Sequence, residues 1–283
     1  MFKIGTLADW FGVGLLKGIE CSRLCGAEGV QLYALNELDP RTMTAARIAE
    51  VRKAAEDNGQ AVTALCGEVG GHGLEIAADN PEKIDYLKRT LDLALELGCS
   101  VVTTHLGVLP EDHTLPKYAA MHSACEELSA YALSAGGCFA IETGPEPVAW
   151  LADFLKDCGP GMAVNYDPAN LVMVTGDDEV EGVRTAGSLI VHTHAKDGVC
   201  NLKTTPEIFY GLFADGGVEA LNASDYATEM PLGEGAVRWP AYLAALKSIG
   251  YSGFLTIERE VGGDAMGEIS RAVSFLKNLL KTL

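Results

Sequence analysis

The stretch LIVHTHAKD, residues 189–197, joins an apolar run to two histidines, a lysine and an aspartate. Successive side chains of a strand point to opposite faces, so His192 and His194 share one face of this predicted strand. His192 lies one strand step below His194, so we expect it to pack inside the fold or to support a ligand from behind. Polar groups at the carboxyl end of a buried strand are typical of the substrate side of a (β/α)8 barrel. The pattern recurs in AIETG (140–144), VNYDPAN (164–170) and LTIERE (255–260).

Hydrophobic periodicity alternates along the chain between short strand-like runs and longer amphipathic helical runs, which predicts repeated βα units and a parallel sheet. Eight strands are expected, over residues 2–7, 30–34, 61–66, 100–105, 138–143, 162–167, 189–194 and 254–258. The helices that follow them are expected over residues 15–26, 42–58, 81–97, 116–135, 148–158, 178–186, 239–249 and 266–280. Because barrels of about 250 residues commonly form one domain, residues 1–283 are predicted to form a single TIM barrel.

A long segment, residues 198–237, separates the seventh predicted strand from its helix. Structureless loops longer than about 15 residues are uncommon in compact domains and often act as lids or binding loops. Because this loop follows a strand, we expect it on the same face as the polar strand ends, where it would cover a substrate or contact another subunit. An insertion without a function is the alternative, since loops accept added residues at a small entropic cost.

The chain is acidic, with 39 Asp and Glu against 21 Lys and Arg and a formal net charge of −18. Nucleic-acid binding depends on basic residues that neutralise phosphates, so no nucleic-acid partner is expected. The N-terminal MFKIGTLADWFG lacks the apolar core of a signal peptide, and no run reaches the roughly 18 apolar residues of a membrane span. The eight cysteines form no CxxC pair, which favours reduced, buried thiols and a cytoplasmic location.

The fifth to eighth predicted strands each end in an ionisable residue, namely Glu142, Asp167, His194 and Glu258. Converging carboxylates repel one another unless a cation or strong donors lie among them. Three carboxylates and one imidazole form an oxygen-rich set that suits one divalent metal ion. Mn2+ is the first expectation, with Mg2+, Co2+ and Zn2+ as alternatives.

Such a cation can hold two neighbouring oxygens of a hydroxy-carbonyl substrate and stabilise the charge of an enediolate. Glu142 and Glu258 belong to strands far enough apart around the rim to approach a bound sugar from opposite faces. One would remove a proton and the other would return it. The alternatives are a metal-dependent dehydratase or lyase acting on a cyclitol or keto-sugar, and a sugar-binding barrel without catalysis.

Further polar or aromatic side chains near predicted strand ends are candidates for substrate binding: Trp10, His105, Asn170, Lys196 and Glu234. His105 ends the fourth strand, and the ring of Trp10, after the first strand, would form an apolar wall against a sugar or pack at the rim. Asn170 would donate to a substrate hydroxyl. Lys196 would orient the substrate or pair with the aspartate beside it, and Glu234 would meet the substrate or cap the next helix. Each of them also has an ordinary structural explanation, because polar groups at a rim are often satisfied by their neighbours.

The set ETGPE, NYDPAN, VHTHAKD, PLGEG and TIERE, spaced over eight βα units, resembles the sugar phosphate isomerase/epimerase superfamily, the xylose isomerase-like TIM barrels. The resemblance runs over essentially the whole chain, and its most specific parts are HAKD and GEG followed by a last strand with Glu. It implies that Glu142, Asp167, His194 and Glu258 bind one divalent metal and that the two glutamates act as the acid–base pair. A sugar isomerase or epimerase of EC class 5, active in carbohydrate metabolism, is the function that it implies.

The chain departs from the epimerase pattern at two positions. Epimerase members place a histidine three residues after the metal aspartate, where this chain has Asn170, and an arginine about six residues after the metal histidine, where it has Cys200. Both normally help to hold the sugar, so epimerase, isomerase, dehydratase and lyase reactions all stay open. The related endonuclease IV barrels use several zinc ions and a richer histidine set, and the acidic charge disfavours DNA. The expected partner is a small-molecule carbohydrate, and a homo-oligomer stays open.

Overall fold

The computed structural model of the protein describes residues 2–214, 223–259 and 263–283. The barrel strands are β1 (Lys3–Leu7), β2 (Gly29–Tyr33), β3 (Ala61–Cys66), β4 (Val101–Thr104), β5 (Cys138–Glu142), β6 (Met162–Tyr166), β7 (Ile190–Ala195) and β10 (Phe254–Ile257). They close in the order β1-β10-β7-β6-β5-β4-β3-β2, and each neighbouring pair is parallel. The predicted (β/α)8 barrel is therefore confirmed.

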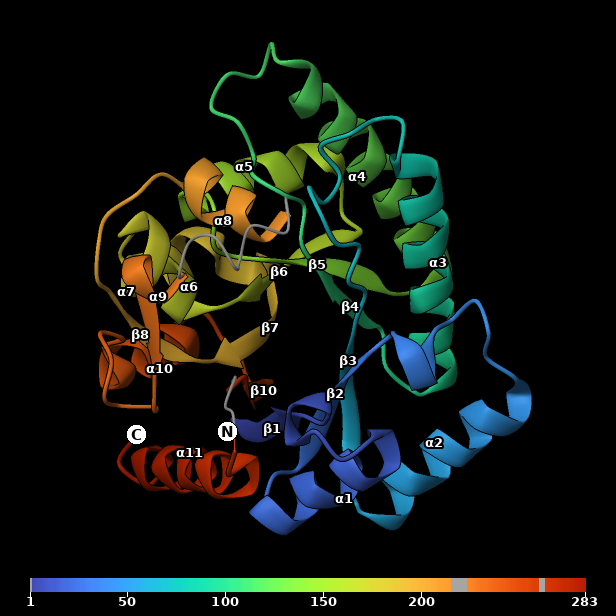
Figure 1. The fold of residues 1–283 in the computed structure, drawn as a ribbon, viewed down its shortest axis with the longest axis vertical. Coiled ribbons are helices and arrows are strands. Elements are labelled where there is room, and N and C mark those ends of the chain that lie inside the picture. Colours follow the sequence, from blue (N-terminus) through green and yellow to red (C-terminus); the bar gives the residue numbers. More distant parts are fainter. Residues whose placement is uncertain (1, 215–222, 260–262) are drawn as a thin grey trace.

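Helices surround the strands, as Figure 1 shows. They are α1 (Leu15–Cys25), α2 (Ala45–Asp57), α3 (Asn80–Glu96), α4 (Pro116–Ala135), α5 (Val148–Cys158), α7 (Glu179–Ala186), α10 (Trp239–Ser248) and α11 (Ala265–Leu280). The ends of α4 illustrate why the sequence folds this way. Pro116 begins it, where the missing N–H has no helical partner to lose. Gly136 ends it with φ 84°, a left-handed conformation that glycine adopts without steric cost.

The chain after β6 differs from the prediction because a short helical segment follows the strand directly. Asp167 accepts hydrogen bonds from the backbone N–H groups of Ala169 and Asn170, and this cap starts α6 (Pro168–Asn170). A π-helical turn, Leu171–Thr175, continues it. The strand-end aspartate and Asn170 are therefore held in one rigid turn.

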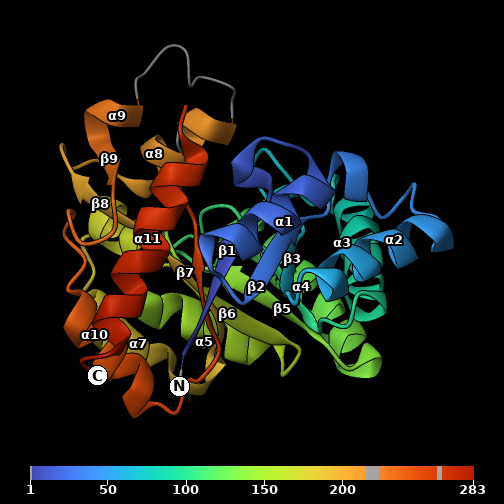
Figure 2. The same ribbon diagram turned by 90° about the horizontal axis from the view of Figure 1, so that it is seen from below.

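Residues 198–237 were predicted as a loop, and their described part has structure of its own. It contains β8 (Asp197–Cys200), α8 (Pro206–Ala214), α9 (Ala223–Tyr226) and β9 (Ala227–Met230), and β8 pairs with β9 in antiparallel fashion. Residues 215–222 lie outside the described residues. Figure 2 shows these elements at the end of the barrel opposite the N-terminus. The two strands were missed because each has four residues and its partner is distant in sequence.

Asp197 connects the start of the insertion, residues 198–237, to the segment that leads into α10 and to the first residue of that helix. Its side chain is fully buried and accepts four hydrogen bonds of 2.8 to 3.1 Å. The donors are the backbone nitrogens of Gly198, Gly233 and Val237 and the indole nitrogen of Trp239. A Cβ on Gly235 would lie 2.1 Å from Asp197 Oδ1, so the second glycine of the GEG motif is required by close approach.

The eight cysteines are free thiols; four of them are buried, three are half-buried and Cys200 is exposed, so the prediction of buried thiols holds for only half of them. Across residues 2–214, 223–259 and 263–283, no helix combines the length and the apolar character needed to cross a membrane.

Candidate metal centre

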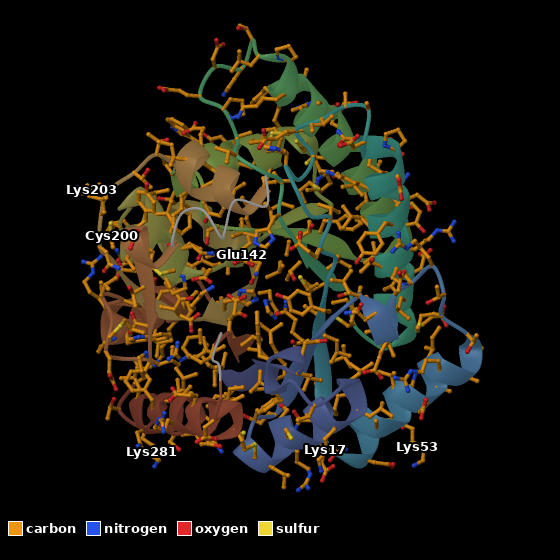
Figure 3. The ribbon with its side chains drawn as sticks, viewed as in Figure 1. Lys17, Lys53, Glu142, Cys200, Lys203 and Lys281 are labelled. Atoms are coloured by element: carbon orange, nitrogen blue, oxygen red, sulfur yellow. The ribbon has the colours of Figure 1, made fainter. Side chains whose placement is uncertain are left out.

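Glu142, Asp167, His194 and Glu258 meet at the carboxyl end of the barrel. Glu142 ends β5, Asp167 and Glu258 directly follow β6 and β10, and His194 is the second-last residue of β7; these four strands are consecutive neighbours in the barrel. Each offers one ligand atom, and these atoms all lie within 4.8 Å of one another. All four side chains are buried. In Figure 3, Glu142 lies near the centre of the barrel, whereas the labelled lysines lie at its outside.

The imidazole of His194 turns Nδ1 toward the three carboxylates. Nδ1 lies 3.2 Å from Glu258 Oε2, 3.4 Å from Glu142 Oε2 and 3.8 Å from Asp167 Oδ2. Strand pairing explains this convergence, because β7 lies between β6 and β10 and the carboxyl ends of all three reach the same rim. Nδ1 is therefore the atom of His194 that would reach a shared cation.

Asp167 shows that the four residues fit a metal ion. Its Oδ1 accepts the two backbone N–H groups of α6, but its Oδ2 is buried and has no hydrogen-bond partner among the residues that the structure describes. His194 Nδ1, at 3.8 Å, is too distant to donate to it. An unsatisfied buried polar group costs about 1–3 kcal/mol, and burial raises the pKa of this carboxyl. A divalent cation among the four side chains would satisfy the unpartnered oxygen.

The electrostatics of the cluster also favour added positive charge. Burial acts to raise the pKa of Glu142, but His194 and His105 outweigh it and hold that pKa well below its usual value. Burial likewise opposes ionisation of Glu258, yet Lys196 and His194 lower its pKa to about 2. Although burial lowers the pKa of His194, these carboxylates hold it well above its usual value. The imidazolium thus supplies charge that a bound cation would replace.

Amide and ammonium groups hold the two glutamates in place. Glu142 accepts hydrogen bonds from Asn170 Nδ2 at 2.9 Å and from Asn165 Nδ2 at 3.1 Å. Lys196 Nζ lies 3.2 Å from Glu258 Oε2. Both glutamates therefore have fixed orientations with an ionised carboxylate.

His105 connects Glu142 to a third glutamate. Its Nε2 lies 3.6 Å from Glu142 Oε2, and its Nδ1 lies 3.4 Å from Glu68 Oε2. Burial acts to lower the pKa of His105, but these two carboxylates raise it well above its usual value. The side chain is 40% exposed, so it lies between the buried cluster and solvent.

A pocket of about 630 Å3 opens above the cluster, and both Glu142 and Glu258 line it. Four of the candidates for substrate binding also line it, namely Trp10, His105, Asn170 and Lys196. The rings of Trp10 and Tyr33 meet edge to face with centroids 6.2 Å apart, and α8 of the insertion contributes Phe209 and Tyr210 to the lining. The pocket thus combines a polar floor with aromatic walls.

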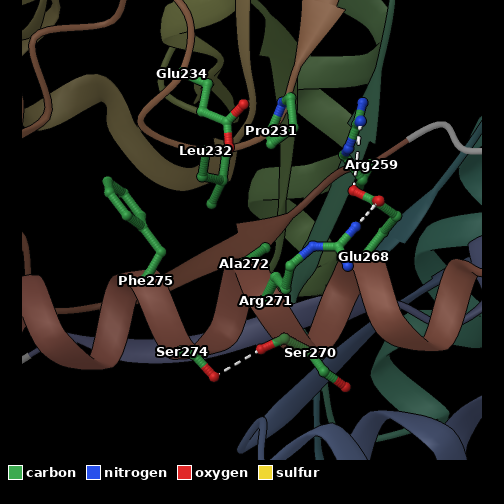
Figure 4. Close-up of a pocket in the computed structure, with 10 residues that line it drawn as sticks. All are labelled: Pro231, Leu232, Glu234, Arg259, Glu268, Ser270, Arg271, Ala272, Ser274 and Phe275. Carbon is green, nitrogen blue, oxygen red and sulfur yellow. Dashed lines mark hydrogen bonds and ion pairs between the residues drawn. The ribbon is translucent and has the colours of Figure 1, made fainter.

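Glu234 does not join this group. It is exposed and lines a second pocket of about 440 Å3 beside α11, which Figure 4 shows. There, Glu268 forms ion pairs with Arg259 and Arg271. The lining of this second pocket contains none of the four clustered residues, so the structure does not bring Glu234 together with the candidate metal centre.

Sequence reasoning missed three residues near the centre: Gln31, Tyr33 and Glu146. Tyr33 and Glu146 line the larger pocket. Burial raises the pKa of Glu146 to about 8, so this carboxyl can donate a hydrogen bond at neutral pH. Gln31 lies behind His194, with Oε1 3.0 Å from Nε2. The signals were a glutamine inside the apolar run GVQLY and the second glutamate of ETGPE.

We expect Mn2+ to raise the melting temperature of the metal-free protein by several degrees. At a concentration 100 times its Kd, a ligand that binds only the folded state adds about 2.7 kcal/mol to stability. The Asp167→Asn variant should bind the ion more weakly, so Mn2+ should raise its melting temperature by less. Asp178→Asn is the matched control, because Asp178 caps α7 as Asp167 caps α6. Differential scanning fluorimetry measures these shifts, and a wild-type melting temperature that is independent of divalent ions would contradict the metal centre.

Comparisons with known proteins agree with the barrel fold. A family model described as "Xylose isomerase-like TIM barrel" matches residues 20–279. A search of curated proteins finds no match. Among solved structures, the chain is similar to a xylose isomerase domain protein from Planctomyces limnophilus, with 26% identity, coverage of 99% of this chain and 97% of that chain, and a TM-score of 0.80.

Two more distant structures share the fold. A D-psicose 3-epimerase, solved in the presence of D-fructose, has 18% identity, coverage of 99% of this chain and 98% of that chain, and a TM-score of 0.70. A probable 3-DHS dehydratase from Bacillus anthracis has 15% identity, coverage of 98% of this chain and 99% of that chain, and a TM-score of 0.78. At these identities the likeness concerns the fold alone.

Proposed function

Because this chain belongs to the xylose isomerase-like TIM barrel family, we propose that it is a metal-dependent isomerase or epimerase of a small sugar or related hydroxy-ketone. The observation that carries the proposal is the unpartnered Oδ2 of Asp167 among four clustered ligand atoms at the base of a sugar-sized pocket. Glu142, Asp167, His194 and Glu258 would hold the ion, Mn2+ in the first instance. The bound cation would stabilise negative charge that develops on the substrate oxygens.

The two glutamates would move the proton. Lys196, 3.2 Å from Glu258, favours the ionised carboxylate, so we assign to Glu258 the removal of a proton from the carbon next to the carbonyl. Glu142 would return a proton to that carbon or to its neighbour. Because the Glu142 carboxylate is ionised at rest, it would first take that proton from His105, which lies 3.6 Å away on the solvent side of the cluster, and Glu258 would afterwards release its proton to solvent. Asn170, which lines the pocket and bonds Glu142, would orient a substrate hydroxyl.

The charge of the pocket favours a substrate without phosphate. Its lining contains six glutamates, of which two are proposed ion ligands and Glu146 is held protonated by burial, and its cationic residues are Lys196 and His105. A phosphate dianion would meet like charges in a partly buried site, where screening is weak. The aromatic rings of Trp10 and Tyr33 instead suit the apolar face of a free sugar or cyclitol. We therefore expect free ketoses and inososes to be better substrates than their phosphate esters.

The test is a panel of free and phosphorylated ketoses and inososes, incubated with the Mn2+-loaded protein in deuterated water. Proton transfer through Glu142 and Glu258 should place deuterium in an epimer or isomer at the reacting carbon, which NMR and mass spectrometry detect. A product that has lost water would identify the dehydratase alternative. Binding of these compounds without exchange or product, by protein that holds its metal, would contradict an enzyme and favour a sugar-binding barrel.

A further inference from the structure

The two ring nitrogens of His194 face different surroundings. Nδ1 faces the three carboxylates, whereas Nε2 faces the interior of the barrel and lies 3.0 Å from Gln31 Oε1. A neutral imidazole that binds a cation through Nδ1 must carry its proton on Nε2. The partner of Nε2 therefore bears on whether Nδ1 is free for the ion.

Gln31 is the acceptor among the described contacts of Nε2. Asn165 Nδ2 also lies near, at 3.3 Å, but it is an amide donor that bonds Glu142 Oε2. The other end of that amide, Asn165 Oδ1, lies 2.8 Å from His192 Nδ1. Asn165 Nδ2 lies near both ring nitrogens, at 3.3 Å from Nε2 and 3.5 Å from Nδ1, and a donor cannot accept the ring proton, so Gln31 Oε1 is the acceptor for the Nε2–H of His194.

The amide of Gln31 is itself held in the required orientation. Gln31 is fully buried on β2, and its Nε2 donates to Thr103 Oγ1 of β4 at 2.9 Å. If the side-chain amide of Gln31 were rotated by 180°, its NH2 would face His194 Nε2, and Nε2 would then have to accept a hydrogen bond. The ring proton would move to Nδ1, the atom that faces the carboxylates. In the structure the Gln31 amide turns its oxygen to His194 and its NH2 to Thr103, which is the orientation that leaves Nδ1 free.

We propose that Gln31 is a positioning residue for the metal centre, which sets the tautomer and ring orientation of His194 from the opposite wall of the barrel. In the closed sheet, β1 and β10 separate β2 from β7, so this contact exists only because the barrel closes. The inference rests on the proposed metal-dependent function. Partners of this kind typically contribute about 10–100-fold to metal affinity.

Isothermal titration of the full-length, metal-free protein with Mn2+ at one fixed pH tests this inference. Gln31→Met keeps the volume but lacks an acceptor, so Kd should rise by about 10–100-fold. Gln31→Glu keeps an acceptor at the same position and should bind Mn2+ within a few-fold of wild type. Gln60→Met is the matched control. Gln60 is also a buried, doubly bonded glutamine, but it contacts Ser22 and Ala27.

The outcomes separate this inference from the proposed function. If wild type binds Mn2+ and Gln31→Met binds it equally well, the role of Gln31 is wrong while the metal centre stands. If Gln31→Glu or Gln60→Met loses as much affinity as Gln31→Met, the effect is general destabilisation and the role is equally wrong. If wild type binds no divalent ion, both proposals fail.

If the Gln31→Met variant does not fold, Thr103→Val provides a second test. This substitution removes the hydrogen-bond partner of the Gln31 amide without touching His194, so it should weaken Mn2+ binding several-fold. Unchanged affinity would overturn the inference.

Discussion

Replacing Glu258 with glutamine should lower turnover by about 10²–10⁴-fold, the usual contribution of general acid–base catalysis. Glutamine keeps the size of the side chain and one carbonyl oxygen for the ion, but it cannot accept the proton. Glu142→Gln should have a loss of similar size, because the second glutamate must return the proton in the proposed reaction. Both side chains are held by donors, Lys196 for Glu258 and Asn170 for Glu142, which limits rearrangement around the substitution.

Turnover is to be measured on the best substrate of the panel, with Mn2+ content determined for each variant. Glu127→Gln is the matched control, since Glu127 is an exposed glutamate whose side chain is 56% accessible and which pairs with Lys88 on the helical surface. Its activity should equal that of wild type. If Glu142→Gln or Glu258→Gln retained wild-type turnover with the metal bound, the acid–base role of that residue would be wrong.

Replacing Asp197 with alanine should destabilise the protein by about 3 kcal/mol or more. Each buried donor that loses its partner costs about 1–3 kcal/mol, and Asp197 accepts from three backbone N–H groups and from Trp239 Nε1. Relaxation of the surrounding segment would let water reach some of these groups, so the total should stay below the sum of four separate losses. Urea denaturation at neutral pH measures the change in the free energy of unfolding.

Two substitutions that remove fewer hydrogen bonds should cause smaller losses in the free energy of unfolding. Asp197→Asn keeps one of the two carboxylate oxygens as an acceptor, so its loss should be intermediate. Trp239→Phe removes a single donor but keeps an aromatic ring against Tyr242 and Phe275, so its loss should be smaller. A loss for Asp197→Ala within about 0.5 kcal/mol, the usual range for surface substitutions, would show that the four hydrogen bonds do not hold the insertion in place.

The barrel was predictable because its signals are local. Each strand of the barrel is a run of four to six residues that contains at least two apolar side chains, and glycines and prolines mark the ends of helices such as α4. The seventh strand was expected over residues 189–194 and forms over Ile190–Ala195. Such shifts of one residue arise because the ends of an element depend on caps and neighbours rather than on periodicity. The paired strands β8 and β9 escaped prediction because their hydrogen bonds join segments that periodicity treats separately.

The chain's own pattern of residues was enough to place Glu142, Asp167, His194 and Glu258 at the same rim, because in a parallel barrel the carboxyl end of every strand lies on one side. It was not enough to place Glu234, which follows no barrel strand and lies in a separate pocket. Nor was it enough to find the unpartnered oxygen of Asp167 or the contact between Gln31 and His194. Which polar atoms meet across the barrel depends on strand register and closure, and these arise from contacts between residues that are distant in the sequence.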